Sequence, residues 1–268
     1  MEHESTMRLA VFFGIFLCMM VLEALMFKKK LRFGRSRWSA NLGLVVLNTV
    51  LVRVLFPVGA VGAALWAQHH HVGLLPMLKL DDIWTVLLAV VILDGVIYGQ
   101  HLLFHRVTWL WRLHQVHHAD RDIDVTTGLR FHPIEIILSM LIKISVVVAL
   151  GAPVMAVIIF EMILNGMAMF NHANVKLPKP LDALLRLVFI TPDVHRIHHS
   201  VLVHETNSNY GFNFSWWDRC FKTYRAQPDM GHDAMTIGLP EYQQQPTHDL
   251  FWMLRLPFNK RRSKHEGV

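Results

Sequence analysis

Long apolar runs occupy much of the first two-thirds of this chain of 268 residues. The run from Leu9 to Phe27 contains one charged residue, Glu23. At about 1.5 Å per residue it is long enough to cross the hydrocarbon core of a bilayer, which is roughly 30 Å thick. Basic residues follow the run instead of preceding it, which indicates a membrane span and not a cleavable signal peptide.

Three further stretches repeat this pattern. One extends from Ala40 to Gln68 and contains Pro57, which predicts a kink. Another extends from Ile83 to Gln100. The last, from Ile136 to Met169, is broken by Gly-Ala-Pro at residues 151–153, which indicates either a turn between two spans or a hairpin that dips into the membrane. We therefore expect an all-α fold with a multi-pass helical stem of about four to five spans.

The charged residues support a membrane body. They make up 17% of the chain, whereas a soluble domain carries about 25%. The net charge is +6, and many of the basic residues gather in two blocks. The first block holds Lys28, Lys29, Lys30, Arg32, Arg35 and Arg37, and the second holds Lys260, Arg261, Arg262 and Lys264. Because the blocks flank apolar segments, they predict cytoplasmic loops and not a nucleic-acid surface.

These blocks predict an orientation. With residues 28–37 in the cytoplasm, the second span places residues 69–82 outside, and the third returns residues 101–133 to the cytoplasmic side. Everything after Phe170 is then cytoplasmic as well. We expect one domain over residues 1–268, ending in a basic, disordered tail at 256–268. Cys18 and Cys220 provide no disulfide framework.

The chain also contains 18 histidines, and many of them are clustered. The clusters are His101-Leu-Leu-Phe-His105, His114-Gln-Val-His117-His118 and His195-Arg-Ile-His198-His199. Residues three and four apart share one face of a helix, so each cluster is expected to direct two or three imidazoles at one point. The predicted topology places all three clusters on the same side of the membrane, where a cytosolic helical cap would hold them.

Clustered imidazoles indicate a metal site, because neutral imidazole binds iron, zinc and copper. A structural zinc needs four ligands, usually including cysteine. A pair of redox metals that activates oxygen beside an apolar substrate accounts better for eight or more histidines, although the spacing alone does not identify the metal. The run His69-His70-His71 lacks helical spacing and lies on the opposite predicted face, so we interpret it as a solvated loop. The isolated His3, His232, His248 and His265 are interpreted in the same way.

Ionisable residues inside spans are candidates for a function. Asp94 lies two helical turns before His101, so it is a candidate for lining a substrate channel or supporting a ligand, and an interhelical structural role is the alternative. Lys143 and Glu161 are expected to pair across the hairpin. Glu23 and Arg53 are interpreted as packing or snorkelling residues.

The order of the three clusters after membrane spans resembles the fatty acid hydroxylase/sterol desaturase superfamily, in particular its bacterial sterol desaturase-type members. The resemblance covers about Asp94 to Tyr224. Its stretches are Tyr98–Arg106, Trp109–His118 followed by Asp120, Leu129–Glu135, Phe170–Asn174, Asn209-Tyr210-Gly211 and Trp217-Asp218-Arg219. Cys220 and Lys222 stand where relatives commonly have leucine and glycine, and neither is a ligand position.

The resemblance implies a dimetal site with two iron ions in the working enzyme, although zinc can substitute in preparations. The implied ligands are His101, His105, His114, His117, His118, His172, His195, His198 and His199. The resemblance leaves open whether His132 is a further ligand or a supporting group fixed by Glu135.

The resemblance also implies a function in lipid biosynthesis. The expected enzyme is an O2-dependent monooxygenase or desaturase that oxidises a C–H bond of a sterol, fatty acyl chain or related lipid. It would lie in the bacterial cytoplasmic membrane and take electrons from a separate ferredoxin, cytochrome b5-like protein or reductase. The ligands do not distinguish hydroxylation from desaturation. The alternatives from other classes are a membrane metal transporter or sensor and a zinc-dependent membrane hydrolase.

Overall fold

A computed structural model describes residues 4–259 of the chain. Its body is a stem of six helices: α1 (Glu4–Leu25), α2 (Trp38–Leu55), α3 (Gly59–His69), α4 (Asp82–Arg106), α6 (Pro133–Leu150) and α7 (Val154–His172). Five segments of the stem are long and apolar enough to cross a membrane, with α2 and α3 counted as one. Residues 4–259 form isolated β-bridges but no β-strand, so the all-α prediction is confirmed.

Small side chains allow the stem helices to approach closely. One core cluster brings together the buried residues Ala60 and Ala64 of α3, Ala89 of α4 and Ala156 of α7. Alanines at such positions let helix backbones pack tightly where lipid supplies no hydrophobic driving force. The expected kink is present as well, because α2 ends at Leu55 and α3 begins at Gly59.

The turn between α6 and α7 decides between the two interpretations of the last apolar stretch. Gly151 ends α6 with φ of +61°, a left-handed conformation that favours glycine. Its backbone lies so close to Gly73 that a Cβ on Gly73 would come within 2.1 Å of the Gly151 nitrogen. Both helices have the length and composition of membrane-crossing segments. These findings favour a turn between two spans.

The expected pair across this hairpin is confirmed. Lys143 Nζ lies 2.7 Å from Glu161 Oε1, and Arg8 of α1 binds the other carboxylate oxygen of Glu161. The carboxylate therefore links three stem helices.

Removing the shared carboxylate is expected to cost more stability than removing one of its partners. Glu161→Ala removes the anion that Lys143 and Arg8 share inside the stem, which we expect to cost ~3–5 kcal/mol. Lys143→Met leaves the pair between Arg8 and Glu161, so we expect a loss of no more than ~1 kcal/mol. Unfolding by denaturing detergent would measure both values, and equal losses would contradict the shared role of Glu161.

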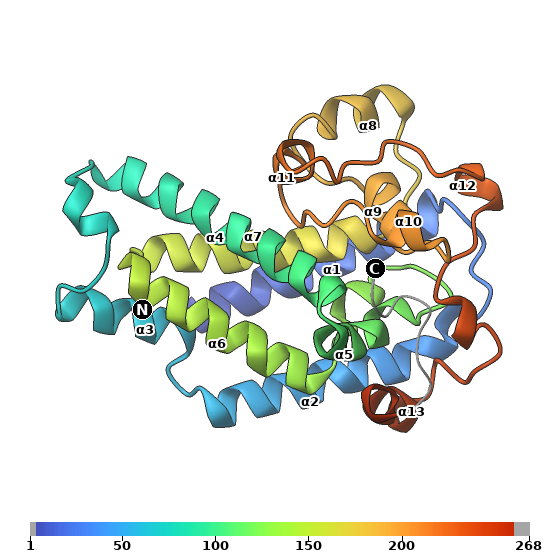
Figure 1. Ribbon diagram of the computed structural model, residues 1–268, viewed down its shortest axis with the longest axis horizontal. Helices are drawn as coiled ribbons and strands as arrows, with labels where there is room; N and C mark the ends of the chain where they lie inside the picture. Colours follow the sequence, from blue (N-terminus) through green and yellow to red (C-terminus); the bar gives the residue numbers. More distant parts are fainter. Residues whose placement is uncertain (1–3, 260–268) are drawn as a thin grey trace.

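The remaining elements form a cap at one end of the stem (Figure 1). They are α5 (Thr108–His118), α8 (Lys179–Leu185), α9 (Pro192–His198), α10 (Val203–Thr206), α11 (Trp216–Cys220), α12 (Gly231–Ala234), α13 (Leu250–Arg255) and the 3-10 turns Gly34–Arg37, Thr127–Leu129, Pro240–Tyr242 and Leu256–Phe258; a further 3-10 turn, Leu75–Leu78, lies between α3 and α4. The first basic block and the three histidine clusters all lie at this end (Figure 1). His69–His71 lie at the other end and are exposed, as expected.

The first residues of the expected tail are structured. Leu256–Phe258 form a 3-10 turn, and Leu256 and Pro257 are buried. Leu256 belongs to a core cluster with Trp111 and Val116 of α5, which explains why this segment is ordered. The remainder of the expected tail at 260–268, including His265, lies outside the described residues, as does His3.

Candidate metal centre

Nine histidines of the described chain meet at the junction between the stem and the cap. They form two groups, and within each group the candidate ligand atoms lie within 4.8 Å of one another. The first group is His101, His105, His114, His118 and His198, and the second is His117, His172, His195 and His199. All nine are buried. They are the nine histidines that the family resemblance implied as ligands.

The spacing of the histidines along their helices decides which group each ring joins. Pairs four residues apart share a group, as in His101 with His105 and His114 with His118. Pairs three residues apart are divided, because His117 lies in the second group while His114 lies in the first. A helix turns about 100° per residue, so four steps end about 40° past the start and three steps about 60° short of it. Each cluster therefore directs two imidazoles at one group, as expected, while the third ring of each H-x2-HH cluster joins the other group.

Three ring nitrogens of the first group face one another. The Nε2 atom of His101 lies 3.1 Å from the Nε2 atoms of His114 and His198. The opposite nitrogens have fixed partners: Nδ1–H of His101 donates to the Tyr210 carbonyl and Nδ1–H of His198 donates to the Ser208 carbonyl, each at 2.7 Å. A neutral imidazole that donates through Nδ1 presents only a lone pair at Nε2. These lone pairs cannot hydrogen-bond one another, and a metal ion bound by the rings would account for their close approach.

The second group repeats this arrangement around His172. Its Nδ1–H donates to the Ala168 carbonyl at 2.6 Å. Its Nε2 atom lies 3.1 Å from that of His117, 3.0 Å from that of His195 and 3.2 Å from that of His199. One lone pair can accept one of these contacts at most, while Nδ1 of each of the other three rings is buried without a partner within the described structure. A metal ion bound by the four rings accounts for this geometry.

Burial keeps the cap imidazoles neutral. It lowers the pKa of His114 to about 3, and it lowers the pKa values of His118 and His199 well below the usual range. Neutral rings retain the lone pair that a metal ligand needs. Within residues 4–259 neither group includes a carboxylate or a cysteine, and such all-imidazole sets suit iron, zinc and copper. The residues present therefore fit two transition-metal ions.

The sequence was also compared with known proteins. Residues 86–223, just over half of the chain, match the family described as fatty acid hydroxylase. The chain belongs to this family. The resemblance stated from the histidine clusters is thereby confirmed.

Several curated relatives show the breadth of the fatty acid hydroxylase family. The ornithine lipid hydroxylase OlsE of Rhizobium tropici is 32% identical over 65% of this chain and 51% of its own length. An alkylglycerol monooxygenase of Danio rerio is 28% identical over 62% of this chain and 35% of its own. The cholesterol 25-hydroxylase of Rattus norvegicus is 24% identical over 53% of this chain and 47% of its own. The chain thus spans about half or less of the relatives it matches. No solved structure matches it significantly.

Glu135 orients one of the candidate ligand rings of the first group. Its Oε1 accepts a hydrogen bond of 2.7 Å from Nδ1 of His114, which orients the ring and directs its Nε2 toward His101. His132 lies outside both groups. Its Nδ1 caps α6 by accepting from the Ile134 backbone N–H at 3.2 Å, and its Nε2–H donates to the Leu254 carbonyl at 3.3 Å. The carboxylate contact expected for His132 is therefore made by His114.

Replacing the carboxyl group of Glu135 by an amide is expected to weaken metal binding without removing a ligand. In Glu135→Gln the amide can present a donor to His114, which disturbs the ring's tautomer and orientation, and supporting groups of this kind contribute about 10–100-fold in metal affinity. Competition with a chelator would measure the loss. Asp182→Asn is the matched control, because Asp182 is a buried cap carboxylate that binds Arg186 and belongs to no candidate metal group of the described residues. Equal affinity in both variants would contradict the role of Glu135.

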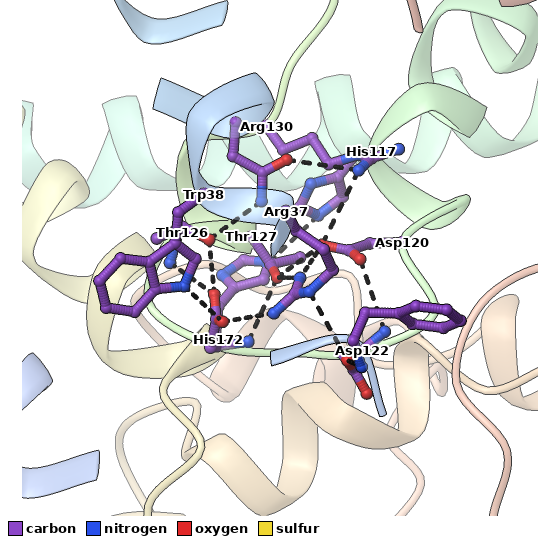
Figure 2. Close-up of polar contacts among 12 residues, drawn as sticks. Arg37, Trp38, His117, Asp120, Asp122, Thr126, Thr127, Arg130 and His172 are labelled. Atoms are coloured by element: carbon purple, nitrogen blue, oxygen red, sulfur yellow. Dashed lines mark hydrogen bonds and ion pairs between the residues drawn. The ribbon is translucent and has the colours of Figure 1, made fainter. Parts of the chain in front are cut away.

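A buried ion cluster anchors the loop after the second histidine cluster. Arg37 is 0% exposed and binds Asp120 and Asp124 directly, with Asp122 at 3.6 Å. Figure 2 shows this guanidinium with Asp120 and Asp122, in a view that also draws His117 and His172. Burial alone would raise the pKa of Asp120, but the charges of Arg37 and Arg130 lower it, so the carboxylate stays ionised. The sequence predicted Arg37 as part of a basic cytoplasmic loop. Its side chain is instead buried and holds the loop that follows the second histidine cluster.

Other contacts that orient the histidine rings could not be predicted from residue types in the sequence. The carbonyls of Ser208 and Tyr210 and the side chain of Asn207, whose Oδ1 lies 3.3 Å from His105 Nδ1, all come from one segment. A backbone carbonyl is present at every position, so no residue type marks its role. Only the resemblance of Asn209-Tyr210-Gly211 to family members pointed to this region.

Asp94 of α4 binds α11 from the stem side. Its Oδ2 accepts a hydrogen bond of 2.8 Å from Trp217 Nε1. Asp94 is buried and belongs to neither histidine group. The hydrogen bond to Trp217 favours a structural role for Asp94 over a role in lining a substrate channel or supporting a ligand. Glu23, expected as a packing or snorkelling residue, similarly accepts from the backbone N–H groups of Val125 and Asn174 and fixes the cap on α1.

Proposed function

We propose that this chain is a membrane-bound oxygenase that hydroxylates a C–H bond of a lipid with two iron ions in the histidine groups. The observation that carries the proposal is the pair of buried all-histidine groups at the end of a helical membrane stem. The overall reaction consumes the lipid, O2, two electrons and two protons, and it yields the alcohol and water. The iron ions would supply the oxygen activation that amino-acid side chains cannot.

The relatives support a lipid as the substrate class. The printed names of three of them share hydroxylation or monooxygenation and a lipid: an ornithine lipid, an alkylglycerol and cholesterol. These names differ in head group, so they support the class and not one molecule. Desaturation of the same C–H position remains the second outcome that this ligand set permits.

The chain's own residues position and protect the site. The carbonyls of Ser208, Tyr210 and Ala168 and the carboxylate of Glu135 fix the ring orientations. Burial of all nine rings excludes bulk water, so that a reactive centre is shielded from side reactions. The electrons would come from a separate donor protein of the ferredoxin, cytochrome b5 or reductase type. The basic block near the centre supports a cytosolic location for the centre. We propose the bacterial inner membrane as the membrane that holds the stem.

Two other classes fit less well. A metal transporter would place candidate ligands along a path through the membrane, whereas the two groups lie together at one end of the stem (Figure 1). A zinc hydrolase uses one metal-activated water and needs neither a second group of four histidines nor a reductant.

An isotope experiment would test the proposed function. Membranes containing the chain would be supplied with reductant and 18O2, and the lipids compared by mass spectrometry with membranes that lack it. We expect a lipid that gains one 18O atom. A lipid that loses two hydrogens without gaining oxygen would assign desaturation instead. Product formed equally without O2 would overturn the oxygenase proposal.

A further inference from the structure

One lobe of the cap exposes many large apolar side chains. The lobe consists of residues 179–190, which include α8, and residues 213–222, which include α11. The two parts are joined by backbone hydrogen bonds from Ile190 to Asn213 at 3.0 Å and from Ser215 to Val188 at 2.9 Å. Its exposed apolar side chains are Leu181, Leu184, Leu187, Phe189, Trp216 and Phe221, with Leu184 at 64% and Phe221 at 61%. Figure 1 shows α8 projecting sideways from the stem.

The lobe is attached to the middle of a membrane span and not to its end. Trp217 of α11 donates its indole N–H to Asp94 of α4 at 2.8 Å. Phe221 stacks on Tyr98 of α4 with ring centroids 5.4 Å apart. A Cβ on Gly95 would lie 2.9 Å from the Trp217 ring, so the glycine is what lets the indole reach the helix backbone. The attachment is therefore specific and closely packed.

This attachment sets the depth of the lobe. A span needs about 20 residues, so hydrocarbon that begins at Asp82 ends near His101. At about 1.5 Å per residue, Tyr98 then lies ~5 Å and Asp94 ~10 Å inside that boundary. The exposed ring of Phe221, directly after α11, stacks on Tyr98 and therefore lies at that level. Helices that lie in a membrane interface bury their apolar face to about this depth.

The charges of the lobe and its entry segment fit the same surface. Every exposed charged side chain in residues 176–190 and 213–222 is basic, namely Lys176, Lys179, Arg219 and Lys222. The acidic residues there are buried: Asp182 binds Arg186, and Asp218 accepts from the Tyr210 and Gly211 backbone. Basic side chains around an apolar patch bind the phosphates of lipid head groups.

We propose that the α8–α11 lobe inserts into the bilayer leaflet nearest the metal centre, with its apolar side chains among the acyl chains and its basic side chains at the phosphates of anionic phospholipids. The topology prediction placed everything after Phe170 in the cytoplasm. In this proposal, the lobe that follows α7 enters the membrane instead. The inserted lobe also contacts α4 directly before His101 and His105. It therefore brings membrane lipid beside the element that carries two of the nine histidines.

The native cysteines allow a direct test. Cys220 is an exposed residue of α11, and Cys18 is the other cysteine of the chain. In a Cys18→Ala variant, Cys220 would be labelled with an environment-sensitive fluorophore and the protein reconstituted in vesicles of phosphatidylethanolamine and phosphatidylglycerol. The control carries Met230→Cys with both native cysteines replaced by alanine, because Met230 is an exposed cap residue outside the lobe.

We expect a doxyl group near the top of the lipid acyl chain to quench the label at position 220 at least ~3-fold more than the label at position 230, and aqueous iodide to show the reverse order. Leu184→Cys, labelled in the same way, should behave like Cys220. Retained metal content would verify that each labelled protein is folded. Equal lipid quenching at all three positions, with full iodide access to position 220, would overturn the proposal.

Discussion

Replacing His198 by alanine is expected to abolish turnover while leaving the protein folded in the membrane. His198 Nε2 lies 3.1 Å from His101 Nε2. The variant therefore loses one ring of the first group, and a metal ion bound to His101 would lose a neighbouring ligand. Supporting groups alone contribute about 10–100-fold in metal affinity, so loss of a ligand should lower activity by more than ~100-fold. Metal analysis should show loss from the first group.

His117→Ala tests the second group in the same way, because His117 Nε2 lies 3.1 Å from His172 Nε2. His132→Asn is the control, since asparagine can still cap α6 and His132 belongs to neither group. The control should keep both metals. Wild-type turnover in both His198→Ala and His117→Ala would refute the ligand assignment.

Arg37→Met is expected to destabilise the chain by ~3–5 kcal/mol, because it leaves buried carboxylates without their main cation. Asp120 would retain the more distant cation Arg130, whose Nη1 lies 4.0 Å away, and the hydrogen bond from the Thr127 hydroxyl at 3.0 Å. The loop that these residues hold follows His117 and His118 directly, so metal binding should weaken along with stability. Detergent-induced unfolding and metal content would be measured on the same samples.

Arg35→Met is the matched control for this variant. Arg35 is exposed and lies 5.3 Å from the ring of Trp38 in a cation–π contact. Its loss should cost no more than ~1 kcal/mol. Equal stability of the two variants would show that the buried ion cluster is not what holds the loop.

The sequence predicted the stem well because one physical signal determines it. Apolar length fixes a membrane-crossing helix, and Pro57 and residues 151–153 marked the two breaks. The distinction between a turn and a dipping hairpin needed the lengths of α6 and α7. The cap was less predictable, since its short helices are fixed by long-range contacts such as Trp217 with Asp94.

The identity of the candidate site residues was predictable, but their division into two groups was not. The family resemblance supplied the nine histidines, including His172, which has no neighbouring histidine. Assigning His117 and His118 to different groups requires knowing which side of α5 faces which partner helix. The rotation of about 100° per residue accounts for the rule that rings four apart share a group. Spacing does not tell which rings of other helices complete each group.

The basic block misled the interpretation of Arg37 for a physical reason. A run of Lys and Arg beside an apolar segment usually faces water and head groups. Here the three aspartates at positions 120, 122 and 124 come from a loop more than 80 residues away, as Asp120 binds Arg37 across 83 positions. Burial of a charge becomes visible only when the fold brings its counter-charges together.

The iron content of the purified chain, measured together with reductant-dependent O2 uptake on the same sample, tests the central claim most directly. The two histidine groups predict about two iron ions per chain, and O2 uptake that requires both the reductant and the lipid. A single zinc ion per chain, with activity that persists under anaerobic conditions, would contradict it.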